Sequence, residues 1–157
     1  LNCYNSVVAG WPIGLILDSE KGNTQKAATD GLLQLHRIVF AGTDLTGSDF
    51  NKVYKDELYD YKTKTTDPSK KSFSSTFFLL PANGNKVVDQ WVARSWQGIQ
   101  SIIAASTSVG GALQGSFAEL QSNNWFDKSA TFVGAFRDAS DDWTAGWANF
   151  DPENTIY

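Results

Sequence analysis

The sequence predicts a mainly β protein made of stacked β-solenoid coils, with helical and loop insertions and a tryptophan-rich C-terminal cap. The first indication is composition. Among 157 residues, 19% are charged, 13% are aromatic and six are Trp, while Gly, Ser, Thr and Asn are frequent. This mixture is typical of short strands joined by tight turns. The second indication is an internal repeat of 32 residues near the N-terminus.

The repeat relates two strand blocks, residues 1–10 and residues 33–42, each of which ends at a glycine. A shift of 32 residues superposes Leu1 on Leu33, Cys3 on Leu35, Tyr4 on His36, Val7 on Val39, Val8 on Phe40, Ala9 on Ala41 and Gly10 on Gly42. A strand followed by a glycine corner, repeated at a fixed period, is typical of stacked coils. Two unrelated amphipathic strands are the alternative, because matches between small apolar residues arise easily by chance.

Other elements of the first half follow from apolar runs and turn signals. Residues 13–17 form a short apolar run that predicts a strand, and the polar residues 19–30 predict a protruding loop. Ser48 suits the N-cap of an amphipathic helix, because apolar side chains then recur every three or four residues as far as Tyr61. The Lys- and Thr-rich residues 62–71 predict an exposed loop.

The second half is predicted in the same way. Residues 72–80 indicate a strand, which Pro81 and the Asn-Gly pair after it bring to an end. Residues 86–105 favour a helix, with a strand as the alternative because the segment is rich in β-branched side chains. The glycine-rich residues 106–115 predict irregular structure, and residues 131–136 predict a last strand.

Residue counts limit the possible classes of protein. With 13 Lys and Arg against 17 Asp and Glu, the net charge of -4 disfavours a general nucleic-acid binder. A single Cys excludes an intrachain disulfide and a cysteine-based zinc site. No apolar run approaches the roughly 18 residues of a transmembrane helix. Because the chain lacks Met and no linker divides it, we expect residues 1–157 to be one unit cut from a longer protein.

An acidic cluster near the C-terminus is the candidate metal site. Its weak calcium candidates are Asp138, Asp141 and Asp142, with Asp151 and Glu153 further along the chain. Calcium prefers several hard oxygen ligands, although this spacing fits no EF-hand loop. The alternative is that these carboxylates cap turns. No other cofactor is indicated.

Two tryptophans beside this cluster are candidate ligand-binding residues. Trp143 and Trp147 lie four residues apart, with Asp141 and Asn149 as polar neighbours. Exposed indole rings stack on the apolar faces of sugars, while polar neighbours bind the hydroxyl groups. The alternative, which we favour, is that these rings close the end of a core, because each tryptophan buries a large apolar area.

The sequence shows no convincing catalytic set. His36, the single histidine, would need Asp30 or Asp44 and one of many serines to form a triad. No Gly-x-Ser-x-Gly elbow is present, and the repeat places His36 opposite Tyr4 on a strand. We therefore favour a protein that is not an enzyme.

Both ends of the chain resemble one family. Residues 4–17 read YNSVVAGWPIGLIL, residues 132–136 read FVGAF, and residues 142–154 read DWTAGWANFDPEN. They resemble the signatures YNSVxxGWPxGLxID and YxGAFG…DWTAGWTNFDPQN in the C-terminal part of large cell-surface proteins, often described as lipoproteins, of Bacteroidetes-type bacteria. The resemblance implies that the chain forms the terminal coils of a right-handed parallel β-helix. It also implies that a segment from about residue 44 to residue 126 is a variable insertion. Arg137 stands where the family has Gly.

The resemblance also implies a location and a role. We expect an extracellular or outer-membrane surface protein with a structural, assembly or ligand-binding role. Leu1, Cys3 and Val7 would then pack on the remainder of the precursor or on another surface chain, because an end coil exposes an apolar side. A glycan-binding or polysaccharide-processing β-helix module is the alternative, by analogy of fold alone. A third possibility is assembly into a larger complex through the open edge.

Overall fold

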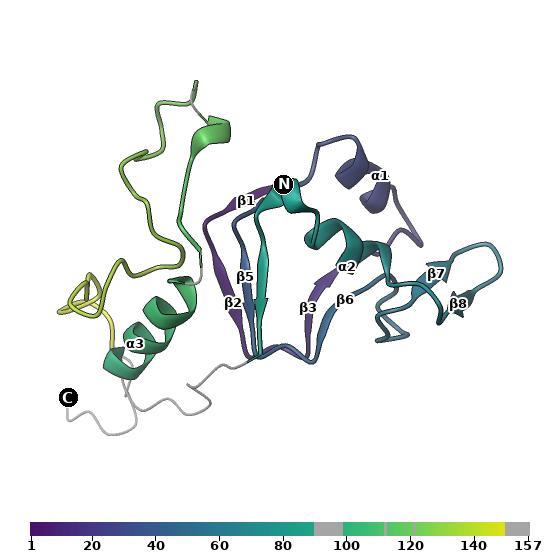
Figure 1. Ribbon diagram of the computed structural model, residues 1–157, viewed down its shortest axis with the longest axis horizontal. Helices are drawn as coiled ribbons and strands as arrows, with labels where there is room; N and C mark the ends of the chain where they lie inside the picture. Colours follow the sequence, from purple (N-terminus) through teal and green to yellow (C-terminus); the bar gives the residue numbers. More distant parts are fainter. Residues whose placement is uncertain (90–98, 112, 121, 150–157) are drawn as a thin grey trace.

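The computed structural model describes residues 1–89, 99–111, 113–120 and 122–149. Within these ranges the chain is a mixed α/β structure with four separate sheets, each of two or three short strands (Figure 1). Three sheets are parallel and together form two facing walls, whereas the fourth is a peripheral antiparallel hairpin.

The bounds of the strands and helices are as follows. The parallel pairs are β1 (Asn2–Tyr4) with β4 (Gln34–His36), and β3 (Ile13–Ile16) with β6 (Leu45–Ser48). The three-stranded sheet has the order β2 (Val7–Ala9), β5 (Val39–Ala41) and β9 (Lys86–Val88). The hairpin is formed by β7 (Leu58–Asp60) and β8 (Thr65–Asp67). The helices are α1 (Thr24–Thr29), α2 (Phe73–Phe78) and α3 (Ile99–Gly110), with 3-10 turns η1 (Pro81–Asn83) and η2 (Ala118–Leu120).

The predicted solenoid is wrong. The structure has several short, separate sheets with helices between their strands, and no right-handed parallel β-helix is formed by the residues described. The physical reason lies at β6, where the N-terminal end of α2 packs in place of a further strand. A side chain added at Gly47 would lie 2.6 Å from the backbone nitrogen of Ser75, so the helix backbone rests directly on this strand.

The strand pairing inferred from the repeat is confirmed, although the fold class is not. Each residue of β1 and β2 pairs with the residue 32 positions later in β4 or β5, for example Val8 with Phe40. Strand β3 pairs with β6 at the same separation, which the repeat over residues 1–10 and 33–42 did not predict. Gly10 and Gly42 turn the chain at equivalent corners, with φ of +73° and +59°, a conformation that glycine adopts without strain. The 32-residue repeat therefore identified the correct register of β1 and β2 on β4 and β5.

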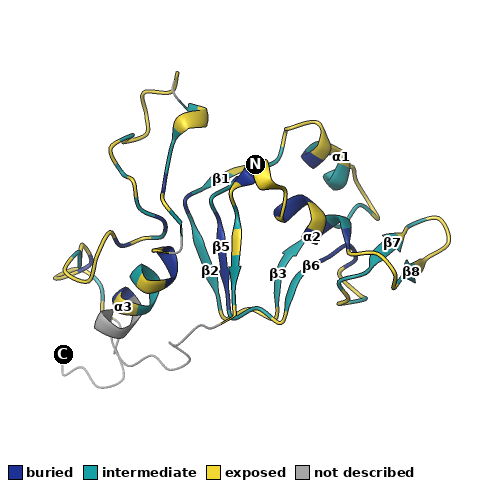
Figure 2. Ribbon diagram, viewed as in Figure 1, coloured by how far each residue is buried: buried dark blue, intermediate teal, exposed yellow. Residues whose placement is uncertain are grey.

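Two clusters of apolar side chains cover opposite faces of the central sheet. Phe40 points towards α2, where its ring stacks on Phe78 with centroids 3.9 Å apart. Val39 and Ala41 point the other way, into a second cluster with Val133 and a residue of α3. Because both faces are covered, all of β5 is buried (Figure 2).

Helix α2 stands where the sequence predicted a strand over residues 72–80. Ser72 caps the helix by accepting a hydrogen bond from the nitrogen of Ser75. The buried Asp49 carboxylate accepts hydrogen bonds from the nitrogens of Phe73 and Ser74, each at 2.9 Å. These contacts satisfy N–H groups that have no partner inside a helix, and they come from a residue more than 20 positions away.

The helix predicted from Ser48 to Tyr61 is also wrong. Ser48 ends β6, a turn follows, and the aromatic residues gather in a small cluster instead. Phe50 stacks on Tyr59 at 4.7 Å, and Tyr61 meets Tyr59 edge-on at 5.0 Å. A turn and a strand of the hairpin carry the spacing that suggested one face of a helix. A continuous α-helix is not possible here, because Tyr54 has a positive φ of +50°.

Several other boundaries differ from those predicted. The loop predicted at 19–30 contains α1, and the loop predicted at 62–71 contains β8. The segment 86–105 begins with β9, continues through residues outside the described ranges and ends within α3. Helix α3 also takes up the first part of 106–115, and residues 131–136 form no strand. The segment of about 44–126, which was predicted to be an insertion, supplies the strands β6 and β9 to the parallel sheets.

Candidate functional site

The first strand layer forms an open edge. Strands β1, β2 and β3 each stand at the end of their own sheet, paired on one side with β4, β5 and β6. On the other side, no strand accompanies them among the residues that the structure describes. An unpaired edge presents rows of backbone N–H and C=O groups that another strand can bind. We call β1, β2 and β3, with the corner of residues 10–12 between β2 and β3, the open edge.

The opposite side of the same stack is covered by side chains and by α2. Asn85 Nδ2 donates to the carbonyl of Leu35 in β4 at 2.9 Å, and Asn85 Oδ1 accepts from the nitrogen of Ile38. Ser74 Oγ donates to the carbonyl of Ser48 at the end of β6 at 2.8 Å. The two ends of the stack therefore differ, because groups of the chain itself satisfy the backbone at β4 and β6.

The residues predicted to pack on a partner lie in this first layer but differ in exposure. Leu1, directly before β1, is 84% exposed. Cys3 packs against the α2-side cluster, with Sγ 3.4 Å from Ser6 Oγ, and Val7 packs against the cluster that contains Val133. Trp11, in the corner between β2 and β3, is 63% exposed. The large exposed hydrophobic side chains of the open edge are thus Leu1 and Trp11, of which Trp11 was not predicted from the sequence.

A polar cluster anchors η2 to two stacked corners, one between β4 and β5 and one between β1 and β2. Arg37 donates from its two terminal nitrogens to both carboxylate oxygens of Glu119, at 2.8 and 2.6 Å, and from Nε to Asn5 Oδ1 at 2.9 Å. His36 stacks on Tyr4 with centroids 5.5 Å apart, as the repeat predicted. Hydrogen bonds from Arg37 lower the pKa of Glu119 to about 2. Burial is the main cause that raises the pKa of Tyr4.

This cluster is an anchor rather than a triad. His36 Nδ1 lies 3.8 Å from a carboxylate oxygen of Glu119. Asp30, one of the carboxylates considered for His36, instead pairs with Lys26 at 2.6 Å. Two further contacts hold the C-terminal segments here, because Asn5 accepts hydrogen bonds from the nitrogens of Ser116 and Gly134. The sequence could not identify Glu119, since 82 positions separate it from Arg37.

The ion pair gives the protein a specific response to acid. The pKa of Glu119 is lowered from 4.5 to about 2 in the folded chain, so its charge stabilises the fold above pH 4.5 and this contribution is lost as the pH falls towards 2. We expect Glu119→Gln to be less stable than the parent at pH 6, with the difference shrinking as the pH falls to 2. Urea denaturation between pH 2 and 6 measures this.

Glu20→Gln is the control for that prediction, because its carboxylate lies on the surface, 4.0 Å from Lys52. Its free energy of unfolding should follow that of the parent at every pH. A Glu119→Gln variant that differs from the parent by the same amount at pH 6 and pH 2 would show that the ion pair contributes no stability.

The two tryptophans that the sequence analysis selected are exposed. Trp143 is 53% exposed and Trp147 is 69% exposed, and their ring centroids lie 5.4 Å apart. Both indole N–H groups donate to backbone carbonyls, those of Ala135 and Trp143 respectively. The rings therefore do not form a buried cap, and their orientations are fixed by their own segment. Asn149, the fourth predicted residue of this group, is also exposed.

The calcium candidates cap turns and pair with an arginine. Asp138 accepts hydrogen bonds from the nitrogen and hydroxyl of Ser140, which lower its pKa, and Asp141 Oδ2 accepts from the backbone nitrogen of Arg137. Asp142 accepts a hydrogen bond from the hydroxyl of Thr144. Within the described ranges, no group of three or more acidic, His or Cys side chains is arranged to hold a metal ion. Asp151 and Glu153 lie outside the described residues, and calcium binding stays a prediction.

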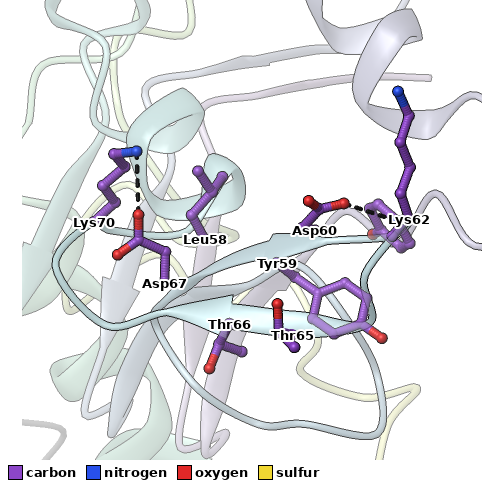
Figure 3. A pocket seen from close by; sticks show the side chains of 9 residues that line it. Leu58, Tyr59, Asp60, Lys62, Thr65, Thr66, Asp67 and Lys70 are labelled. Atoms are coloured by element: carbon purple, nitrogen blue, oxygen red, sulfur yellow. Dashed lines mark hydrogen bonds and ion pairs between the residues drawn. The ribbon is translucent and has the colours of Figure 1, made fainter.

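A separate hollow of about 520 Å³ lies on the β7–β8 hairpin (Figure 3). Tyr59, Asp60 and Thr65 are among the residues that line it, and Lys70 pairs with Asp67 at its margin, 3.1 Å apart. The carboxylate of Asp60 accepts hydrogen bonds from two backbone nitrogens, so its charge closes the hairpin turn. The hollow thus follows from the shape of the hairpin, and its charged residues Asp60, Asp67 and Lys70 hold that shape.

Comparison of the chain with protein-family models, with curated proteins and with solved structures finds no match to any of them. The resemblance to cell-surface proteins therefore stays a prediction. Among the helices in the described part of the chain, none is long and apolar enough to cross a lipid bilayer.

Proposed function

We propose that this chain is a non-catalytic assembly module that docks an extended segment of another polypeptide chain along its open edge. One observation carries the proposal: within the described part of the chain, β1, β2 and β3 each have a strand partner on one side only, whereas side chains and α2 cover the opposite side of the stack at β4 and β6. Strand addition to a sheet edge is a common mode of peptide recognition.

The partner's segment should run parallel to β1, β2 and β3. Strands β4, β5 and β6 already follow the first layer in this way, bending at equivalent corners and keeping a constant register. A segment laid on the open edge meets the same bends, so it needs short strands separated by residues that adopt a positive φ, as Gly10 and Gly42 do. A glycine-containing strand–corner–strand segment meets this requirement.

Exposed apolar groups support docking at this edge. Leu1 and Trp11 belong to the first layer and expose most of their side chains to solvent. Exposed tryptophan rings are enriched at protein interfaces, where they contribute disproportionately to binding energy. Together with the resemblance at the two ends of the chain, this supports the proposal of a structural component of a cell-surface assembly.

A synthetic peptide with the sequence of residues 1–17 is a suitable probe, because it carries the strand–corner–strand pattern of the first layer. We expect it to bind the full chain with a dissociation constant of about 1–100 μM. Trp11→Lys in the full chain should weaken binding by at least about tenfold through loss of an apolar contact. Fluorescence anisotropy of the labelled peptide measures both values.

Two controls separate edge docking from general adhesion. Tyr54→Lys, at a side chain 62% exposed but outside the first layer, should leave the affinity unchanged. A peptide in which Val8 is replaced by proline should not bind, because proline interrupts an extended ladder. Equal binding by the Trp11→Lys and Tyr54→Lys chains would overturn the proposal. A dimer of the chain alone that Trp11→Lys dissociates would also overturn it, since the occupant would then be a second copy.

A further inference from the structure

The surface around Trp143 combines an aromatic platform with a polar hollow. Trp143 and Trp147 lie 5.4 Å apart with their rings tilted by 33°. Phe136 also contacts Trp143, with ring centroids 6.1 Å apart, and Phe136 is itself buried. Phe136 and Arg137 belong to the lining of a hollow of about 310 Å³ between the end of α3 and residues 131–137. The platform and the hollow are therefore neighbours.

We propose that this surface binds a neutral oligosaccharide, with Trp143 and Trp147 as stacking residues. The inference is independent of the open edge. The indole N–H groups already donate to Ala135 and Trp143 carbonyls, so the rings offer their faces rather than donors to a ligand. Trp147, which is 69% exposed, is the main stacking residue, and the neighbouring ring of Trp143 extends the apolar surface beside it. Polar side chains of the hollow, Thr107 and Gln114, are suited to sugar hydroxyl groups.

The local charge selects a neutral ligand over an acidic one. Residues 137–142 carry three carboxylates, those of Asp138, Asp141 and Asp142, and one guanidinium, that of Arg137, so their net charge is negative. Arg137 is held by two of them, with nitrogen–oxygen distances of 3.2 Å to Asp138 and 3.9 Å to Asp141. A uronate would meet net negative charge here, whereas neutral hydroxyl groups can donate to the carboxylates.

A glycan array that holds neutral and uronate-containing oligosaccharides tests the proposal with the full chain. We expect binding confined to neutral members, with quenching or a shift of tryptophan fluorescence when the best of them is titrated. Trp147→Ala should weaken that binding by at least about tenfold, and Trp147→Phe, which keeps an aromatic face, should weaken it less. The matched control is Trp125→Ala, since Trp125 is 88% exposed but lies outside this platform.

Three results would each overturn the proposal. They are the absence of binding to any neutral glycan, a preference for uronates, and equal affinity of the Trp147→Ala and Trp125→Ala variants. Circular dichroism of each variant verifies its fold. Because Trp11 lies in the open edge, Trp11→Lys should leave glycan binding unchanged, so that failure of one proposal is distinguishable from failure of the other.

Discussion

Asp49→Ala should destabilise the protein by about 3 kcal/mol or more, because the substitution leaves buried donors without partners. The Asp49 side chain is 1% exposed and accepts hydrogen bonds from the nitrogens of Phe73 and Ser74 and from the Ser74 hydroxyl. The carboxylate also lies at the N-terminal end of α2, where negative charge is favourable. Its loss should release α2 from β6. Urea denaturation followed by circular dichroism measures the change.

Asp127→Ala is the matched control for this prediction. Asp127 also accepts hydrogen bonds from a backbone nitrogen and a hydroxyl, both of Ser129, but it lies at an exposed turn. Water replaces the lost partner there, so we expect a loss within about 0.5 kcal/mol. Asp49→Asn should fall between the two, since it keeps one acceptor oxygen. Equal stability of the Asp49→Ala and Asp127→Ala variants would contradict the role assigned to Asp49.

Phe78→Ala should cost about 3–5 kcal/mol, the range observed for removal of a buried phenylalanine ring. Phe78 is fully buried, and its ring stacks on Phe40 in β5 at a centroid distance of 3.9 Å. Its removal opens a cavity between α2 and the central sheet, in the cluster that also contains Leu17 and Leu35. Thermal and urea unfolding should both show the loss, together with a weaker near-ultraviolet signal from the aromatic core.

Phe126→Ala provides the comparison, because Phe126 is 38% exposed and stacks on Phe117 at 5.4 Å away from that cluster. We expect it to lose less than half as much stability as Phe78→Ala. If the two variants unfolded at the same urea concentration with the same slope, the packing of α2 on β5 would not be a main source of stability.

The register of β1 and β2 on β4 and β5 was predictable because the sequence repeats after 32 residues. The apolar side chains of residues 1–10 and 33–42 match in order, and glycines at equivalent positions mark the corners. The candidate stacking residues Trp143 and Trp147 were also identified from sequence alone. Their exposure was not, because whether an indole covers a core depends on segments that arrive from elsewhere in the chain.

Helix α2 shows why local pattern failed in the middle of the chain. Residues 72–80 are rich in Phe, Ser and Thr, which favour strands as readily as helices in isolation. The helix forms because Asp49 supplies acceptors for its first N–H groups. In addition, Phe77 and Phe78 pack in an apolar cluster with residues from other elements. Tertiary contacts thus outweighed intrinsic propensity.

By itself, the sequence determined the pairing of β1 and β2 with β4 and β5. Its net charge of -4 also makes a general nucleic-acid binder an unfavourable interpretation. Only the tertiary structure decided that, among the residues described, no further strand pairs with β6. The physical reason is that α2, held by Asp49 and resting on Gly47, packs where another strand would pair with β6. Such contacts between residues far apart in sequence leave no periodic signal, so they become visible only when the chain is folded.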